Sequence, residues 1–182
     1  AQALKRHGID HVFTLCGGHI QAIYDGCLDE GIRVVDTRHE QTSGHCADGY
    51  ARVTGKPGVC LVTAGPGITD VVTAVANAQR AGVPMICIGG ASESWRNGMG
   101  AFQEERQVLI TTPFCKFSHG IEHVHRIPFY VEMAVRNAIY GRPGASYLDM
   151  PDDIITGKVD ELRVEEPGRC PDPPRTQAIS TD

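Results

Sequence analysis

One acidic residue, Glu40, stands where a short apolar strand passes into a helix. Residues 33–36 contain two adjacent valines, typical of a buried strand, and Gly44, Ala47 and Ala51 recur at the spacing of a closely packed helix face. Open α/β sheets bind their ligands at the carboxyl ends of strands. A carboxylate here is suited to sharing a proton with a bound base. It could also do no more than cap its own helix.

Two further side chains could do chemistry. His19 follows two glycines at a predicted turn, so its imidazole can either point into a cleft or remain solvated. Gln103 lies in a loop that contains Gly, Ser and Asn, where it is either functional or simply exposed. The turn at residues 65–67 (GPG) resembles a phosphate loop but lacks the Lys-Ser/Thr and the three-glycine spacing of the known motifs.

Two patterns that resemble metal sites are set aside. His39 and Glu40 do not begin a zinc-binding helix, because Ser43 stands where that motif requires His. The three histidines of residues 119–125 lack a complementary carboxylate or thiolate, so we expect a solvated stretch there. The sequence therefore predicts no metal ligands in this chain.

The bulk composition is that of a soluble globular protein. Of 182 residues, 41% are hydrophobic and 21% charged, and the formal net charge of -5 gives no electrostatic case for nucleic acid or anionic membranes. The seven cysteines form no Cys-x-x-Cys pair, and Cys60 and Cys87 lie in apolar runs, which favours a reducing compartment without disulfides. We expect a protein of the cytoplasm or of another reducing compartment, such as the peroxisome, whose targeting segments are not visible.

Apolar runs and helical periodicity alternate along the chain. Strands are predicted at residues 11–15, 33–36, 58–63, 84–89 and 145–149, with a less regular stretch at 114–117. Helices are predicted at residues 20–29, from Glu40, after residue 67 and at 127–140. This alternation indicates an α/β fold, a three-layer αβα sandwich with a parallel sheet of about six strands. Residues 1–156 are predicted to form the domain, and the charged, Pro-rich residues 157–182 a linker.

Several linked motifs carry a family resemblance. They are residues 13–19 (FTLCGGH), 36–40 (DTRHE), 49–52 (GYAR), 57–67 (PGVCLVTAGPG) and 102–104 (FQE). In this order and at these intervals they resemble the N-terminal, pyrimidine-binding domain of thiamine diphosphate enzymes of the acetolactate synthase superfamily. Residues 18–19 and 36–40 most resemble benzaldehyde lyases, residues 99–104 and 139–145 resemble 2-hydroxyacyl-CoA lyases, and residues 57–67 fit acetolactate synthases equally well.

The resemblance implies roles for the residues singled out above. The family's matching Glu hydrogen-bonds N1′ of the cofactor's aminopyrimidine, so Glu40 is implied to activate thiamine diphosphate. His19 is implied to contact the substrate oxygen and relay protons, and Gln103 to reach toward the reacting centre. Cofactor contacts are implied for Gly17, Gly18, Pro66, Gly67 and Asn77. Mg²⁺ and the diphosphate would be held by an Asp-rich Gly-Asp-Gly segment that this sequence lacks, carried on a separate C-terminal domain.

The resemblance also implies an activity. We expect a thiamine diphosphate-dependent C–C lyase or carboligase of the 2-hydroxyacyl-CoA lyase or benzaldehyde lyase type, of which this chain is a fragment inactive alone. Alternatives are acetolactate synthase and then oxalyl-CoA decarboxylase; acetolactate synthases tend to carry a small residue at the position of His19. A non-catalytic oligomerisation domain would not need Glu40, and a flavodoxin-like nucleotide binder would need a phosphate-cradling turn after the first strand. We expect a homodimer or homotetramer acting on a 2-hydroxyacyl or 2-oxo acid substrate, with the face of Gly44, Ala47 and Ala51 near a subunit contact.

Overall fold

A single parallel sheet organises the chain. The fold is taken from a computed structural model that describes residues 1–164 and 166–173. The sheet has six strands in the order β2-β1-β3-β4-β6-β5, and all five neighbouring pairs are parallel. The strands are β1 (His11–Thr14), β2 (Arg33–Asp36), β3 (Gly58–Val62), β4 (Met85–Ala91), β5 (Phe117–Gly120) and β6 (Ala145–Pro151). The predicted α/β architecture with a six-stranded parallel sheet is confirmed.

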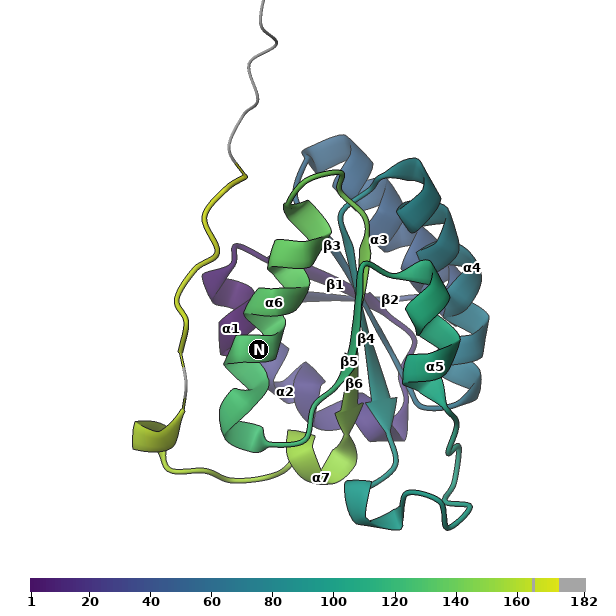
Figure 1. The fold of residues 1–182 in the computed structure, drawn as a ribbon, viewed down its shortest axis with the longest axis vertical. Helices are drawn as coiled ribbons and strands as arrows, with labels where there is room; N and C mark the ends of the chain where they lie inside the picture. Colours follow the sequence, from purple (N-terminus) through teal and green to yellow (C-terminus); the bar gives the residue numbers. More distant parts are fainter. Residues whose placement is uncertain (165, 174–182) are drawn as a thin grey trace, which may run out of the picture.

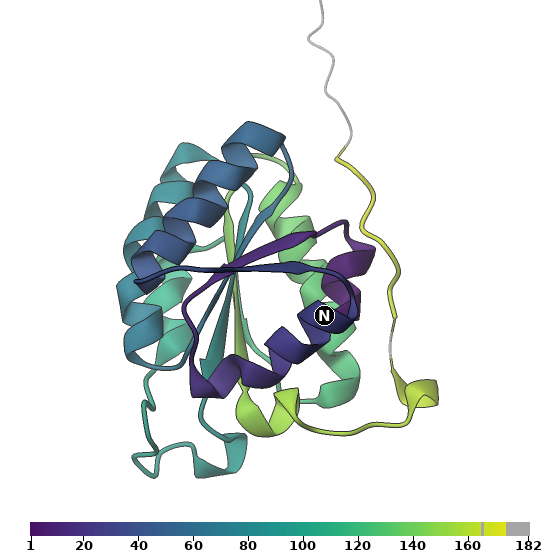
Figure 2. The same cartoon turned by 180° about the vertical axis from the view of Figure 1, so that it is seen from behind.

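Helices cover both faces of this sheet (Figures 1 and 2). The α-helices are α1 (Gln2–Arg6), α2 (Gln21–Asp29), α3 (Glu40–Thr54), α4 (Pro66–Ala81), α5 (Gln107–Thr111), α6 (Ile127–Ile139) and α7 (Asp152–Ile155). Helices α1, α2 and α6 share one hydrophobic core with the sheet, and α3 and α4 share the other. Among the described residues, no helix is both long and apolar enough to cross a membrane.

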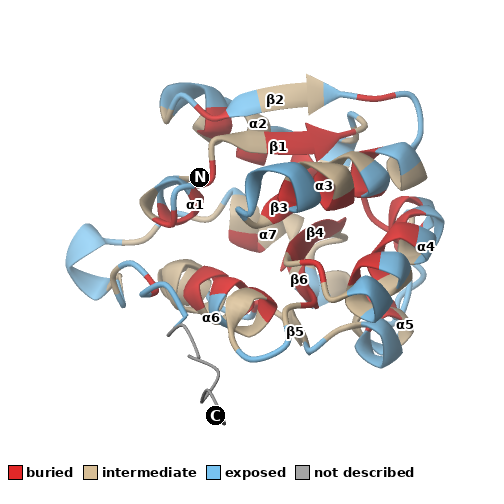
Figure 3. Ribbon diagram, turned by 90° about the horizontal axis from the view of Figure 1, so that it is seen from above, coloured by how far each residue is buried: buried red, intermediate tan, exposed pale blue. Residues whose placement is uncertain are grey.

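Alternation along the central strands feeds the two cores. Val59 and Leu61 of β3 belong to the α1–α2–α6 core, whereas Cys60 and Val62 belong to the α3–α4 core. All five residues of β3 are buried, as expected for a parallel strand covered on both faces (Figure 3). The burial predicted for Cys60 and Cys87 is confirmed.

The sixth strand is the element that the sequence did not define. Residues 114–117 were expected to be irregular, but β5 begins at Phe117 and pairs with β6 at the edge of the sheet. All four of its residues are only half-buried. A short edge strand with one neighbour needs no continuous apolar run, so its sequence pattern is weak.

The small-residue face of α3 packs inside its own domain. A Cβ atom at Gly44 would lie 2.5 Å from Cβ of Ala74 on α4, and one at Gly58 would lie 2.0 Å from the carbonyl oxygen of Ala47. Ala51 is also buried, with 3% of its surface exposed. This face therefore packs within its own domain against α4 and β3, and its expected proximity to a subunit contact stays a prediction.

Part of the predicted linker also packs against the domain (Figure 1). The Cys170 backbone N–H donates to Nδ1 of His7 (3.1 Å), and the Cys170 side chain joins the hydrophobic core at 4% exposure. The Tyr140 hydroxyl donates to the carbonyl of Pro171 at 3.1 Å. Residue 165 and residues 174–182 of the predicted linker lie outside the described residues.

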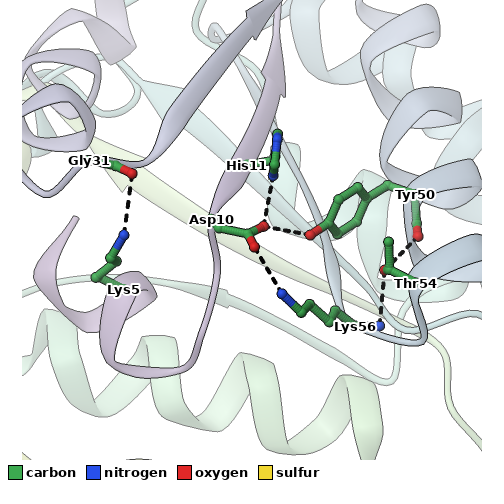
Figure 4. A network of polar contacts seen from close by, with 7 residues as sticks. All are labelled: Lys5, Asp10, His11, Gly31, Tyr50, Thr54 and Lys56. Atoms are coloured by element: carbon green, nitrogen blue, oxygen red, sulfur yellow. Dashed lines mark hydrogen bonds and ion pairs between the residues drawn. The ribbon is translucent and has the colours of Figure 1, made fainter.

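A polar network lies at the amino-terminal ends of the strands, called the amino edge below (Figure 4). The opposite side of the sheet, where the strands have their carboxyl ends, is called the carboxyl edge. Asp10, just before β1, accepts hydrogen bonds from the Tyr50 hydroxyl (2.5 Å) and from Nδ1 of His11 (2.8 Å). Its other carboxylate oxygen accepts from Nζ of Lys56 at 2.9 Å. These donors, Tyr50 first, hold the pKa of Asp10 well below its usual range. The network ties β1 to the end of α3 and to the turn before β3.

Candidate active site

The predicted site residues lie at the carboxyl edge of the sheet, where the order in which strands are added reverses between β1 and β3. Strands β1 and β3 are neighbours, while β2 lies beyond β1, so the connections after β1 and β3 leave on opposite sides. Such a switch point at the carboxyl ends of parallel strands is the usual ligand crevice of an open α/β sheet. The residues after β1, β2 and β3 supply His19, Glu40 and the turn at residues 64–67.

Thr63, just after β3, lies at the centre of this edge. Its hydroxyl lies 3.2 Å from Nδ1 of His19. A Cβ atom at Gly17 would lie 2.3 Å from Cβ of Thr63, and one at Gly67 would lie 3.0 Å from its methyl group. The glycines at 17 and 67 therefore let the loop after β1 and the turn after β3 pack closely around one threonine. A Cβ at Gly18, by contrast, would have no neighbour within 4 Å, so packing does not explain that glycine.

Glu40 is the first residue of α3, and it is half-buried. The helix is capped instead by His39, whose Nδ1 accepts the backbone N–H of Gln41 at 3.1 Å. A Cβ atom at Gly67 would lie 3.7 Å from Oε1 of Glu40. Among residues 1–164 and 166–173, no hydrogen bond or ion pair reaches this carboxylate. The interpretation of Glu40 as a simple capping residue is therefore not supported, and its oxygens are available to a ligand.

His39, Glu40 and Asp70 form a group that could be mistaken for a metal site. Their nearest ligand atoms all lie within 4.8 Å of one another, and Nε2 of His39 lies 3.9 Å from Oδ2 of Asp70. However, Nδ1 of His39 already accepts the hydrogen bond from Gln41. The neutral ring then carries its proton on Nε2 and offers no lone pair toward Asp70. This tautomer, inferred from the hydrogen bond, argues against a metal held by these three residues.

Gln103 reaches the same edge from the loop after β4. Among the described residues it is the one non-glycine residue with positive φ, at 59°. Its backbone oxygen would lie 2.6 Å from a Cβ atom at Gly65, so the loop presses directly onto the β3 turn. The Glu104 carboxylate accepts the backbone N–H groups of Gly98 and Ala101. These donors lower the pKa of Glu104, and the hydrogen bonds stabilise the loop that carries Gln103.

Phe102 connects this loop to His19. The two rings are stacked, with centroids 6.1 Å apart and planes 18° from parallel. Phe102 nevertheless keeps 75% of its surface exposed. The imidazole of His19 is thus held between the Thr63 hydroxyl and an aromatic face, at the edge where Glu40 and Gln103 also lie.

Comparison with known proteins identifies the family of the chain. The family model "Thiamine pyrophosphate enzyme, N-terminal TPP binding domain" matches residues 1–110. The chain belongs to this family. Thiamine pyrophosphate is the thiamine diphosphate of the resemblance above, so the recognition from sequence motifs is confirmed.

The relatives have two kinds of name. The chain is 43% identical over 153 residues to a probable acetolactate synthase of Mycobacterium bovis, covering 84% of this chain and 28% of the relative. It is 45% identical over 155 residues to 2-hydroxyacyl-CoA lyase 2 of Danio rerio, covering 85% and 25%. It is 38% identical over 178 residues to 2-hydroxyacyl-CoA lyase 1 of Homo sapiens, covering 98% and 31%. The chain thus spans about a quarter to a third of the length of these relatives.

One predicted contact of this TPP binding domain lies elsewhere. Asn77 is ten residues beyond Gly67 on α4, about 15 Å along the helix axis. Its exposed side chain donates to Oδ2 of Asp48 at 2.9 Å, and Asp48 also pairs with Arg52. The structure therefore does not bring Asn77 to the edge that holds Glu40, His19 and Gln103.

One buried residue behind the β3 turn of the TPP binding domain was not predicted from the sequence. Gln107, the first residue of α5, is 2% exposed and hydrogen-bonds Gly65, Gly90 and Asp149. Gln107 and Asp149 line a hollow of about 910 Å³ beneath the loop of Gln103. The available signal was Asp149, an acidic residue within an otherwise apolar strand.

Proposed function

We propose that the full-length protein is a thiamine diphosphate-dependent enzyme that cleaves or forms a C–C bond beside a carbonyl, of the 2-hydroxyacyl-CoA lyase or benzaldehyde lyase type. The observation that carries this proposal is Glu40, a half-buried carboxylate beside Gly67 to which no described residue donates. A purely structural copy of the domain would have no reason to leave this carboxylate unpaired at a strand edge.

The residues at this edge fit the pyrimidine end of the cofactor. Glu40 would share a proton with N1′ of the aminopyrimidine ring: the carboxylic acid donates it to the ring nitrogen, and the carboxylate accepts it from the protonated ring. Gly17, Gly65 and Gly67 let the loop after β1, the turn after β3 and the Gln103 loop pack closely together beside Glu40. Pro66 begins α4 and fixes the turn between the two glycines. When bound, thiamine diphosphate supplies an acidic thiazolium C2–H and an electron sink for the pair released when the C–C bond breaks.

His19 favours a lyase over a synthase. Its imidazole can donate or accept a proton near neutral pH, which suits contact with the hydroxyl of a 2-hydroxyacyl substrate. The Thr63 hydroxyl and the Phe102 ring hold it in place. Gln103 is proposed as a further contact to the substrate. Acetolactate synthase is the second candidate, because relatives of equal similarity carry that name; oxalyl-CoA decarboxylase is the third.

The test compares two reactions in the full-length enzyme. Cleavage of 2-hydroxyacyl-CoA substrates and condensation of pyruvate are assayed with wild type, His19→Ala and the exposed control His123→Ala. We expect His19→Ala to lower cleavage by about 10²-fold, as for other proton-transferring groups, with little change in cofactor affinity. His123→Ala should match wild type. Strong pyruvate condensation that survives in His19→Ala would instead favour the synthase.

Three further assignments accompany the proposal. We propose that Mg²⁺ and the diphosphate are held by a C-terminal domain of the full-length protein, since this chain has no Gly-Asp-Gly segment. We also propose a homodimer or homotetramer in a reducing compartment, the cytoplasm or the peroxisome. Exposed Trp95, Met99 and Phe102 on one loop at the site edge support an assembly contact. Sedimentation of an active monomer would contradict it.

A further inference from the structure

Gln107 joins the β3 turn to the middle of the sheet. Its Oε1 accepts the backbone N–H of Gly65 at 2.6 Å, and its Nε2 donates to the carbonyl oxygen of Gly90 at 2.9 Å. The same Nε2 donates to Oδ1 of Asp149 and lies 3.2 Å from the Tyr147 hydroxyl. One amide therefore connects the turn after β3, the end of β4 and the end of β6.

The Gly65 N–H needs this acceptor. Gly65 has φ 58° and ψ -108°, a conformation that L residues with a side chain rarely adopt, and the residue is buried. The backbone of Gln103 presses on it from the loop side, so the turn is held between Gln103 and Gln107. A buried N–H without a partner costs about 1–3 kcal/mol, which is enough to change the turn.

The Nε2 end of the Gln107 side chain is equally fixed. Asp149 accepts from both Gln107 and the Tyr147 hydroxyl, and Tyr147 is fully buried. Burial raises the pKa of Asp149, although the two hydrogen bonds oppose that rise. Only a side chain that accepts at one atom and donates at another can satisfy Gly65, Gly90 and Asp149 together, and the Gln amide does so.

We propose that Gln107 is a positioning residue for the reaction: by fixing the Gly65–Gly67 turn against β4 and β6, it sets where the cofactor's pyrimidine ring lies relative to Glu40. This inference rests on the proposed function. Gln107 does not itself face the ring, because its amide is consumed by protein partners.

The test uses the full-length enzyme with a matched control. Gln107→Met keeps the length of the side chain but removes the amide. Gln79→Met removes a comparable hydrogen bond, from Ala145 N–H to Oε1 of Gln79 (2.9 Å), which lies away from the site. Three quantities are measured: thiamine diphosphate affinity by calorimetry, hydrogen–deuterium exchange at C2 of the bound cofactor, and the free energy of unfolding.

Both Met variants should lose stability, but only Gln107→Met should change the cofactor readouts. We expect its affinity or its C2 exchange rate to fall by about tenfold or more, the effect of one lost buried hydrogen bond. Equal effects of Gln107→Met and Gln79→Met on affinity and exchange would overturn the proposal. Glu40→Gln serves as the reference. If it too leaves C2 exchange unchanged, the proposed function has failed rather than the role of Gln107.

A second variant keeps the test decisive if Gln107→Met does not fold. In Gln107→Glu the side chain can still accept from Gly65, but it can donate to Asp149 or Gly90 only when protonated. Its cofactor affinity should therefore fall as the pH rises from 5.5 to 8, beyond any change in wild type. The titratable and charged groups around this position are Tyr147, Asp149, Cys87, Glu104, Glu105, Arg106, His119 and Glu122. A pH profile for Gln107→Glu that parallels wild type would also overturn the proposal.

Discussion

Two carboxylates at opposite edges of the sheet have opposite surroundings. Asp10, at the amino edge, accepts from Tyr50, His11 and Lys56 (Figure 4). Glu40, at the carboxyl edge, has no donor among the described residues. A carboxylate with three donors is stabilised in its ionised form and is unavailable for proton exchange. The unpaired carboxylate is the one that remains free to act on a ligand.

The backbone shows the same difference. The amino edge is closed by long side chains that reach between elements distant in sequence, such as Lys56 to Asp10. The carboxyl edge is built with glycines at 17, 65 and 67, where added Cβ atoms would collide with Thr63 or Gln103. Side-chain bonds thus secure one edge, while close backbone packing at glycines builds the other.

The largest predicted effect is an opposite response of C2 exchange and stability to changes at Glu40 and at Asp10. In the full-length enzyme, Glu40→Gln should slow C2 exchange of thiamine diphosphate by roughly 10²–10⁴, because the amide cannot take part in proton sharing. Its free energy of unfolding should stay within about 0.5 kcal/mol of wild type, since no native contact is lost. Asp10→Asn should do the reverse, leaving exchange unchanged and lowering stability. Hydrogen–deuterium exchange and urea unfolding measure the two quantities.

The control for both is Asp25→Asn, which changes an exposed acid on α2. It should alter neither quantity. Loss of C2 exchange in Asp10→Asn, or wild-type exchange in Glu40→Gln, would show that the division between the two edges is wrong.

The second prediction sharpens the comparison through pH. The folded-state pKa of Asp10 lies well below the unfolded value of about 3.9. Its contribution to stability is therefore complete above the unfolded pKa and is lost as the pH falls through the folded one. Because the Asp10 side chain is 40% exposed, we expect only about 1 kcal/mol.

The measurement is the difference in unfolding free energy between wild type and Asp10→Asn, followed by urea titrations from pH 7 to pH 2. The subtraction removes carboxylates common to both proteins. The difference should be constant above about pH 5 and shrink below about pH 4. A difference that grows as the pH falls would mean that the network around Asp10 does not favour the ionised carboxylate.

Local sequence patterns predicted the parts of the fold that depend on periodicity. The central strands and the helices after Glu40 and after the 65–67 turn follow from apolar runs, glycines and helical spacing. The patterns failed where a residue's partner is distant in sequence. The hydrogen-bond partners of Gln107 include Gly65 and Asp149, each 42 residues away in the sequence. Cys170 lies in a segment whose composition indicates a linker, but its N–H is accepted by His7, 163 residues earlier.

The site could be predicted in part for the same reason. Motifs identified Glu40, His19 and Gln103, and the structure brings all three to one edge, beside Gly67, Thr63 and Gly65 respectively. The capping role of His39 was not visible, because Glu40 occupies an equally plausible position at the start of the helix. Likewise, the spacing of Gly44 and Ala47 indicated close packing but could not say that α4 and β3 supply the partner.

The smallest predicted effect concerns the packed segment around Cys170. His7 is 9% exposed, and burial lowers its pKa below the ordinary value of about 6.5, with Glu132 opposing and Arg6 and Arg169 reinforcing the shift. A depressed folded-state pKa means that the stabilisation is complete above about pH 6.5 and is lost as the pH falls, because protonated Nδ1 cannot accept the Cys170 N–H. Between pH 7.5 and pH 5.5 we therefore expect the hydrogen-exchange protection factor of the Cys170 amide to fall by no more than about tenfold, after correction for the intrinsic exchange rate. His7→Asn, which offers a non-titrating acceptor, should make protection independent of pH over this range. Equal protection of wild type at both pH values would show that the His7 hydrogen bond does not hold this segment, whereas the Asp10 and Glu40 predictions would be unaffected.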